Sequence, residues 1–201
     1  MQGKTQVKTE LLPFDGSAML MTSFLGPDSA TCYFEELLQN NPWEQRAITM
    51  FGKTVDEPRL STWHSTQNLT YAYSGLLRTP AVWTPLLAEL LELCQSASGA
   101  KFNSVLINLY RDGNDSMGWH ADNEKANGPE PTIASISLGT SRRFDLRHRE
   151  SKETIRTELT HGSLLVMSGK SQNAWLHQIP KSKRVTEPRI NLTFRWVHSS
   201  R

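Results

Sequence analysis

The stretch that decides the fold is residues 102–124, which reads FNSVLINLYRDGNDSMGWHADNE. Its first half alternates apolar and polar residues with the period of two that a β-strand requires. Its second half ends in His120 and Asp122. On an extended strand, residues two apart point to the same face, whereas on a helix they diverge. The sequence therefore predicts an imidazole and a carboxylate side by side, as two ligands of a metal ion.

A third ligand has to come from another part of the chain. His177 is the strongest candidate, because it lies 55 residues after Asp122 in an alternating run at residues 175–179. Two histidines and one carboxylate leave part of the coordination sphere open, which suits non-haem Fe(II) that activates oxygen. His-x-Asp is common by chance, however, and the chain has six histidines. Ordinary strand histidines at positions 120 and 177 are therefore the alternative.

The C-terminal run at residues 189–196, RINLTFRW, supplies a second pattern. Its odd-numbered positions are all polar, and they begin and end with Arg189 and Arg195. Six residues of strand separate the two arginines by about 20 Å at Cα, and two long side chains leaning inward can close around a small dianion. Asn108 and Tyr110 form a similar polar face. Because buried charges must be paired, such faces predict a pocket for a polar ligand, with a solvent-exposed edge as the alternative.

These motifs, taken in order, resemble the AlkB family of Fe(II)- and 2-oxoglutarate-dependent dioxygenases. They are Asn-x-Tyr at 108–110, Trp-His-x-Asp at 119–122, His177, and PRINLTFR at 188–195. The resemblance covers about residues 69–197. It implies an α+β, mainly β fold: a double-stranded β-helix (jelly-roll) core with flanking N-terminal helices. It also implies that the iron ligands are His120, Asp122 and His177, and that the residues binding 2-oxoglutarate are Asn108, Tyr110, Arg189, Asn191 and Arg195.

The activity implied by the resemblance is oxidative demethylation of N-alkylated bases, such as 1-methyladenine and 3-methylcytosine, in DNA and also in RNA. The reaction uses Fe(II), 2-oxoglutarate and O2, with ascorbate as the reductant in vitro, and releases formaldehyde, succinate and CO2. The damaged base has to be flipped out or already unpaired. Two other interpretations stay open: a 2-oxoglutarate dioxygenase acting on RNA or on protein, and a non-catalytic cupin-like binding protein. A zinc hydrolase could use the same triad but would not require the paired arginines.

Substrate contacts are also implied by the resemblance. Tyr73 occupies the position of an aromatic residue that stacks on the flipped base, and Tyr71 that of a neighbouring lid residue. Glu124 matches an acidic residue near the exocyclic amine, and Phe51 resembles a hydrophobic finger inserted into the duplex. Ordinary strand tyrosines, a loop carboxylate and a surface turn are the alternatives. The net charge is only +2, but cations cluster in two segments. Phosphate contacts are accordingly expected from Arg142, Arg147, Lys181 and Lys183.

The chain of 201 residues is long enough for one well-buried domain. Within the domain 1–201 we expect a loose N-terminal arm at 1–17, a nucleotide-recognition lid at 43–75 and a catalytic jelly-roll core at 100–198. Strands are predicted at residues 103–110, 133–138, 143–147, 154–159, 164–167, 175–179 and 190–197.

Two helices are predicted before residue 100. Gly26-Pro27-Asp28 begins the first, which ends at Asn40-Asn41-Pro42, and Thr84-Pro85 begins the second, which ends at Ser98-Gly99. Each contains one cysteine, Cys32 or Cys94, which we expect to be buried thiols rather than a disulfide.

Composition and the N-terminal sequence bear on the compartment. The chain is 37% hydrophobic and 21% charged, and no apolar run approaches the roughly 20 residues that a membrane span needs. The N-terminal residues lack the continuous apolar core of a secretion signal. We therefore expect a cytoplasmic protein, nuclear in a eukaryote, that is monomeric and does not bind membranes.

Overall fold

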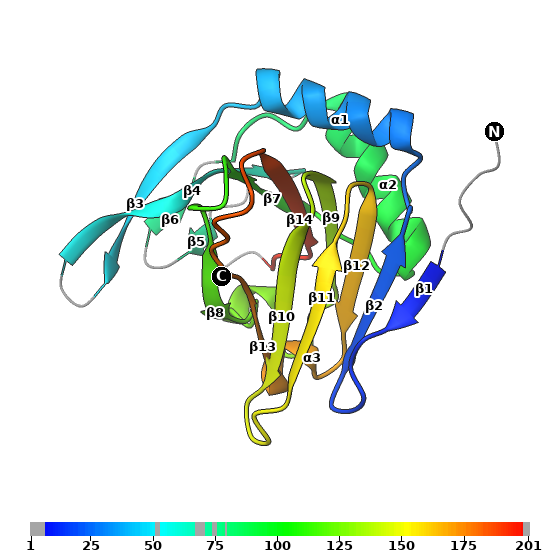
Figure 1. Ribbon diagram of the computed structural model, residues 1–201. Coiled ribbons are helices and arrows are strands. Elements are labelled where there is room, and N and C mark those ends of the chain that lie inside the picture. The colour runs from blue at the N-terminus through cyan, green and yellow to red at the C-terminus, as the bar shows by residue number, and fades with distance from the viewer. Residues whose placement is uncertain (1–6, 51–52, 67–70, 74–75, 79, 199–201) are drawn as a thin grey trace.

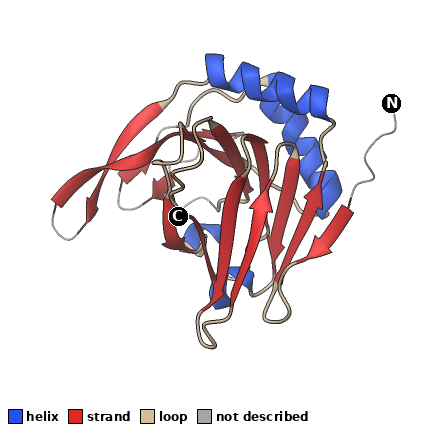
Figure 2. Ribbon diagram, viewed as in Figure 1, coloured by secondary structure: helices blue, strands red, loops and turns tan. Residues whose placement is uncertain are grey.

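The computed structural model describes residues 7–50, 53–66, 71–73, 76–78 and 80–198. Two antiparallel sheets face each other, and two long helices cover the outer side of the larger one (Figures 1 and 2). In spatial order the larger sheet comprises β1 (Val7–Glu10), β2 (Ser17–Thr22), β12 (Ser163–Ser168), β9 (Ile133–Gly139), β14 (Arg189–Arg195), β7 (Ser104–Tyr110), β4 (Lys53–Ser65) and β3 (Glu44–Met50). The architecture is the mainly β jelly roll that the sequence predicts.

The smaller sheet lies across the core from the larger one and carries two of the predicted metal ligands. Its strands, in spatial order, are β11 (Thr154–Leu159), β10 (Arg142–His148), β13 (Trp175–Ile179) and β8 (Met117–His120). A separate hairpin pairs β5 (Tyr71–Tyr73) with β6 (Leu76–Arg78). Two short helical turns, η1 (Lys125–Asn127) and α3 (Ser171–Ala174), flank the metal-ligand segments.

Helices α1 (Pro27–Asn40) and α2 (Pro85–Ser98) have the bounds that their local signals predict. Thr84 caps α2, because its side chain accepts a hydrogen bond from the Leu87 N–H, and Gly99 ends the helix with a left-handed φ of 69°. Leu87 and Leu90 of α2 pack into the core against the larger sheet. No helix in the described part of the chain is long and apolar enough to cross a membrane.

Strict alternation along β7 and β14 separates two compartments. On β14, Ile190, Leu192 and Phe194 pack in the core shared with the helices. The intervening positions, including Arg189 and Asn191, line a cavity between the two sheets. The predicted polar face is therefore interior rather than solvent-exposed, and every residue of β14 is buried.

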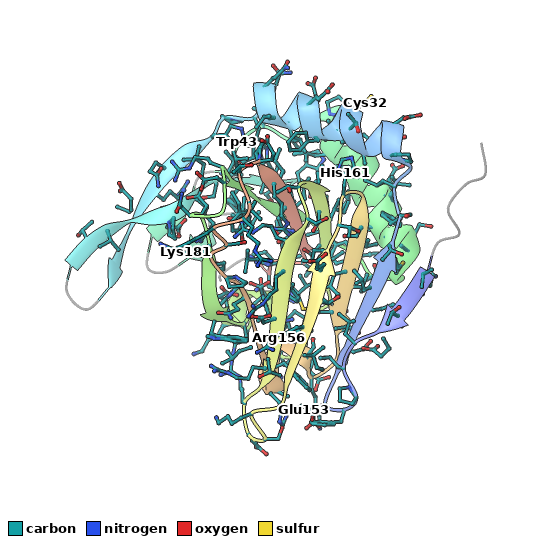
Figure 3. The ribbon with its side chains drawn as sticks, viewed as in Figure 1. Cys32, Trp43, Glu153, Arg156, His161 and Lys181 are labelled. Atoms are coloured by element: carbon teal, nitrogen blue, oxygen red, sulfur yellow. The ribbon has the colours of Figure 1, made fainter. Side chains whose placement is uncertain are left out.

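The N-terminal half departs from the expectations in three places. Residues 7–10 were expected in a loose arm but form β1, and Leu12 is buried. Within the expected lid at 43–75, β4 pairs with β7 and so belongs to the larger sheet. Cys32 is exposed on the outer side of α1, whereas Cys94 is buried as predicted (Figure 3). An amphipathic helix buries one stripe only, and Cys32 lies outside it.

Candidate active site

His120, Asp122 and His177 form a compact cluster between the two sheets. One ligand atom from each residue lies within 4.8 Å of those from the other two. His120 is the last residue of β8, and its register partner on the neighbouring strand β13 is His177. Asp122 follows two residues later, in the loop after β8 rather than on the strand. Strand pairing therefore brings the two imidazoles together, with ring centroids 4.2 Å apart.

Both imidazoles can present a lone pair to a metal ion. His120 Nδ1 lies 2.9 Å from the carbonyl oxygen of Gly118. Because a carbonyl only accepts, Nδ1 carries the proton, and Nε2 is left with its lone pair. Burial first, and then the nearby His120, lower the pKa of His177 to about 3, although the charge of Asp122 acts in the opposite direction. His177 is therefore neutral at physiological pH, as a metal ligand must be.

Asp122 is held at its backbone and at its carboxylate. Its backbone N–H donates to Oε1 of Gln172 at 2.8 Å, and its Oδ1 accepts a hydrogen bond from Nη2 of Arg195 at 2.7 Å. Burial raises the pKa of Asp122, but the opposing effects, led by the positive charge of Arg195, lower it more, so the net direction is downward. Asp122 is therefore an anion, oriented toward the histidines.

A cavity between the sheets contains this triad and all five residues predicted to bind 2-oxoglutarate: Asn108, Tyr110, Arg189, Asn191 and Arg195. Arg189 is only 1% exposed. Its Nη2 donates to Ser137 at 2.9 Å, but its Nε and Nη1 have no partner among the described residues. Burial lowers the pKa of Arg189 to about 10. A buried guanidinium with two unused donors fits an anionic ligand, such as a carboxylate.

The other polar residues of the cavity are already engaged with the protein. Asn191 donates to Ser135 Oγ and to the carbonyl oxygen of Ile136, and its Oδ1 accepts from Thr193. The ring of Tyr110 lies beside the guanidinium of Arg189, 5.2 Å from centroid to Cζ. Contact of Asn191 with a cosubstrate would therefore require one of its present bonds to be exchanged.

Two residues near the cavity, Arg59 and Glu57, were not predicted from the sequence. Arg59 donates from Nε to Oδ1 of Asn108 at 3.0 Å, and its Nη2 forms an ion pair with Glu57 at 3.1 Å. Both side chains are about 95% buried. They orient Asn108 from the neighbouring strand β4. The alternation of Glu57, Arg59 and Ser61 is the signal that could have identified them, because it repeats the polar period of β14.

The structure describes some of the residues expected to contact the base. Glu124 is half-buried beside the triad and accepts a hydrogen bond from Asn127 at 2.8 Å. Burial raises its pKa, the charge of Arg195 lowers it and that of Asp122 raises it, with a net upward direction. Tyr71 and Tyr73 are the first and last residues of β5, one strand of the small hairpin. Phe51 lies outside the described residues. These assignments stay predictions.

Of the four residues expected to contact phosphate, three are at least partly exposed and one is buried. Lys181 and Lys183 are exposed in the loop between β13 and β14, and Figure 3 draws Lys181 on the side where the β3–β4 hairpin projects. Arg147 is partly exposed, and its guanidinium stacks over the ring of Trp119 at 4.3 Å. The expected phosphate contact of Arg142 is wrong, because this residue is 2% exposed and donates only to backbone carbonyl oxygens. An inward-facing position on β10 cannot reach a phosphate.

Comparison with known proteins agrees with this geometry. The family model of the 2OG-Fe(II) oxygenase superfamily matches residues 17–195. The chain is 38% identical over 189 residues to bovine alpha-ketoglutarate-dependent dioxygenase alkB homolog 3, covering 89% of this chain and 65% of that protein. It is 38% identical over 194 residues to mouse DNA oxidative demethylase ALKBH2, covering 91% of this chain and 81% of that protein. The chain thus spans slightly less than two thirds of alkB homolog 3.

The fold comparison points the same way. The solved structure of OsALKBH1 superposes with a TM-score of 0.67, covering 94% of this chain and all of that one, at 15% identity. The family implies Fe(II) and 2-oxoglutarate, and the residues present fit both. Two imidazoles with one carboxylate suit Fe(II), and the donors of Arg189 that have no partner among the described residues suit a carboxylate of the cosubstrate. By sequence and by fold, the chain belongs to the AlkB family of the 2OG-Fe(II) oxygenase superfamily.

Proposed function

We propose that this protein is an Fe(II)- and 2-oxoglutarate-dependent demethylase that repairs N-alkylated bases, 1-methyladenine and 3-methylcytosine, in DNA and also in RNA. The observation that carries the proposal is the buried Arg189, which lines the same cavity as the His-Asp-His cluster and whose Nε and Nη1 have no partner in the described part of the chain. A zinc hydrolase would not require this arginine, and a non-catalytic binding protein would have no need to keep it together with an intact metal triad. The name of the ALKBH2 relative, DNA oxidative demethylase, supports DNA as the substrate.

Each residue of the cavity has a role in this proposal. His120, Asp122 and His177 hold Fe(II), which together with 2-oxoglutarate and O2 supplies the oxidising chemistry that removes the methyl group as formaldehyde and leaves succinate and CO2. Arg189 and Tyr110 bind the carboxylate that lies far from the metal. Arg195 is hydrogen-bonded to Asp122, so it is close enough to the metal to bind the carboxylate next to the keto group.

The remaining cavity residues orient the same ligand. Asn108 and Asn191 hydrogen-bond the cosubstrate, and Arg59 fixes the amide of Asn108 by occupying its oxygen. Arg189 and Arg195 are both buried, so their bonds to a carboxylate are not screened by water. We expect cosubstrate to bind before the base, because the cavity lies between the sheets and the base approaches from outside.

The substrate side is proposed from position and charge. Tyr71, Tyr73 and Phe51 contact the flipped base or its neighbours, and Glu124 faces the exocyclic amine. Arg147, Lys181 and Lys183 contact phosphates, which positions the strand without reading its sequence. We expect the protein to act as a monomer, in the cytoplasm, or in the nucleus if its source is a eukaryote.

The test is a demethylation assay read by mass spectrometry. Purified protein is incubated with Fe(II), ascorbate, 2-oxoglutarate and an oligonucleotide carrying 3-methylcytosine, with Asp122→Ala as the control. The expected result is the loss of one methyl group, dependent on 2-oxoglutarate and absent in the variant. Succinate formed without demethylation would replace the substrate with another, such as RNA or protein. Neither product from folded, iron-loaded protein would favour a cupin-like binding protein.

A further inference from the structure

Arg142 is a buried arginine at the junction of two surface loops, and both of its terminal nitrogens are hydrogen-bonded. We name residues 111–116, between β7 and β8, the platform loop, and residues 180–186, between β13 and β14, the basic loop. Arg142 donates from Nη1 to the carbonyl oxygen of Asp112 at 3.0 Å, and from Nη2 to those of Asp115 at 2.8 Å and Pro180 at 2.9 Å. One buried side chain therefore joins both loops to β10.

The two loops also bind each other directly. The Gly113 N–H donates to the carbonyl oxygen of Val185 at 2.9 Å, and the Ser182 N–H donates to that of Gly113 at 2.8 Å. A Cβ on Gly113 would lie 1.7 Å from the carbonyl oxygen of Ser182, so only glycine permits this approach. The platform loop is also held together internally, because Asp115 accepts two hydrogen bonds from the Arg111 guanidinium, both 2.8 Å long.

The basic loop carries three cations that follow closely in sequence on the last residue of the metal cluster. Lys181 comes four residues after His177, and Lys183 and Arg184 follow it. All three are exposed, and among the described residues none of them forms an ion pair. A flexible loop would place these charges anywhere within reach of its length. The bonds from Arg142 and Gly113 give them one position relative to β8 and β13, the two strands that carry His120 and His177.

We propose that Arg142 is a positioning residue for nucleic-acid binding, which holds the basic loop on the platform loop so that Lys181, Lys183 and Arg184 meet the phosphates of a strand whose base is in the active site. The inference rests on the proposed function. Arg142 does not line the cosubstrate cavity. Its guanidinium lies over the ring of Tyr110, 5.6 Å from the centroid, but it donates no hydrogen bond to a residue of the cavity. It therefore acts on nucleic-acid affinity through the loop, not on cosubstrate affinity.

The test compares Arg142→Met with Arg143→Met. Arg143 is the next residue of β10, is about half exposed and pairs with Asp145 on the outer face, so it controls for loss of one charge at the same place in the sequence. Binding is measured by fluorescence anisotropy, with a labelled single strand containing 3-methylcytosine, 2-oxoglutarate and Mn(II) in place of Fe(II), between 50 and 200 mM salt. A third variant, Lys181→Ala with Lys183→Ala, removes two of the loop cations directly.

The expected result has three parts. Arg142→Met raises the Kd for the oligonucleotide about tenfold, leaves the Kd for 2-oxoglutarate within twofold, and lowers the salt dependence. Two lost phosphate contacts reduce the slope of log K against log salt by about 1.4. Adding Arg142→Met to the double lysine variant weakens binding by less than threefold, because both changes remove the same contacts. A merely structural role would lower the melting temperature without this coupling.

Other outcomes separate the inference from the proposed function. If the double lysine variant binds as tightly as wild type, the proposed phosphate contacts of the loop fail. If it binds weakly while folded Arg142→Met matches Arg143→Met, the role of Arg142 is overturned and the phosphate contacts stand. Should Arg142→Met not fold, Gly113→Ala is measured instead, because its Cβ displaces the basic loop from the opposite side. Wild-type affinity in Gly113→Ala would then overturn the inference.

Discussion

Replacing Arg189 by methionine is expected to stabilise the protein without cosubstrate while it destroys cosubstrate binding. Methionine has a similar length and apolar stem but carries no charge. Arg189 is buried, its Nε and Nη1 have no partner among the described residues, and its Nη2 is bonded only to a neutral serine, Ser137. A buried charge without a counter-ion is costly, so its removal relieves the folded state.

The magnitude follows from the pKa of Arg189. Burial lowers it from the ordinary arginine value to about 10, and a tenfold change in a protonation equilibrium corresponds to about 1.4 kcal/mol. Holding the charge therefore costs about 3 kcal/mol, to order of magnitude. Losing the hydrogen bond to Ser137 costs about 1 kcal/mol. The net gain of about 2 kcal/mol corresponds to a rise in melting temperature of about 6 °C for a domain of this size.

The assay is thermal unfolding with and without 2-oxoglutarate and Mn(II), combined with calorimetric titration of 2-oxoglutarate. A ligand that binds only the folded state raises the melting temperature of wild type. Arg189→Met is expected to have a higher melting temperature than wild type without ligand, and adding 2-oxoglutarate is expected not to raise it further. Loss of two charge-assisted bonds, each worth roughly 1.5 kcal/mol or more, raises the Kd at least about a hundredfold. A melting temperature below wild type without ligand, or a Kd within tenfold of wild type, would refute this account of Arg189.

Three further predictions concern the metal site, the core and acid stability. Gln172→Leu removes the acceptor of the Asp122 N–H and is expected to weaken Mn(II) binding about tenfold to a hundredfold; an unchanged EPR titration would exclude that role for Gln172. Leu90→Ala leaves a cavity at a side chain with no exposed surface, and is expected to lower the free energy of unfolding in urea by about 2–5 kcal/mol. Burial raises the pKa of Asp145, but hydrogen bonds led by that from Arg143 lower it more. Its stabilisation is thus present above about pH 4 and lost as pH falls through the folded-state pKa, so the stability of Asp145→Asn should change less than that of wild type between pH 5 and pH 2.

Local chemistry explains which parts of the fold could be predicted from the sequence. Thr84, Pro85 and Gly99 act within one turn of the ends of α2, so both ends were predicted to the residue. Strand β14 was predicted because its alternation is complete. By contrast, all four side chains of β1 are exposed, so no hydrophobic period marked it. Its pairing with β2 is non-local and depends on the sheet edge that is available.

In the site, too, local relationships could be predicted from the sequence and non-local ones could not. Proximity in sequence grouped Arg142 with Arg143 and Arg147 as one basic cluster, but a strand sends neighbouring residues to opposite faces. The sequence could bring His120 and Asp122 together, since they are two residues apart. It could not show that Gln172 orients Asp122, because that hydrogen bond joins residues 50 positions apart and glutamine carries no distinctive pattern.

Arg142 and Arg189 show what distinguishes a structural arginine from one that binds a ligand. Both are buried, both carry a pKa lowered by burial, and both guanidiniums lie within 6 Å of the ring of Tyr110. They differ in how their donors are used. Arg142 directs its two terminal nitrogens at three carbonyl oxygens, and none of its nitrogens is left buried without a partner. Arg189 donates to Ser137, and its Nε and Nη1 have no partner among the described residues, so both are available to a ligand. For a buried arginine, the number of donors without a partner therefore distinguishes a ligand-binding residue from a structural one, whereas its charge and its burial do not.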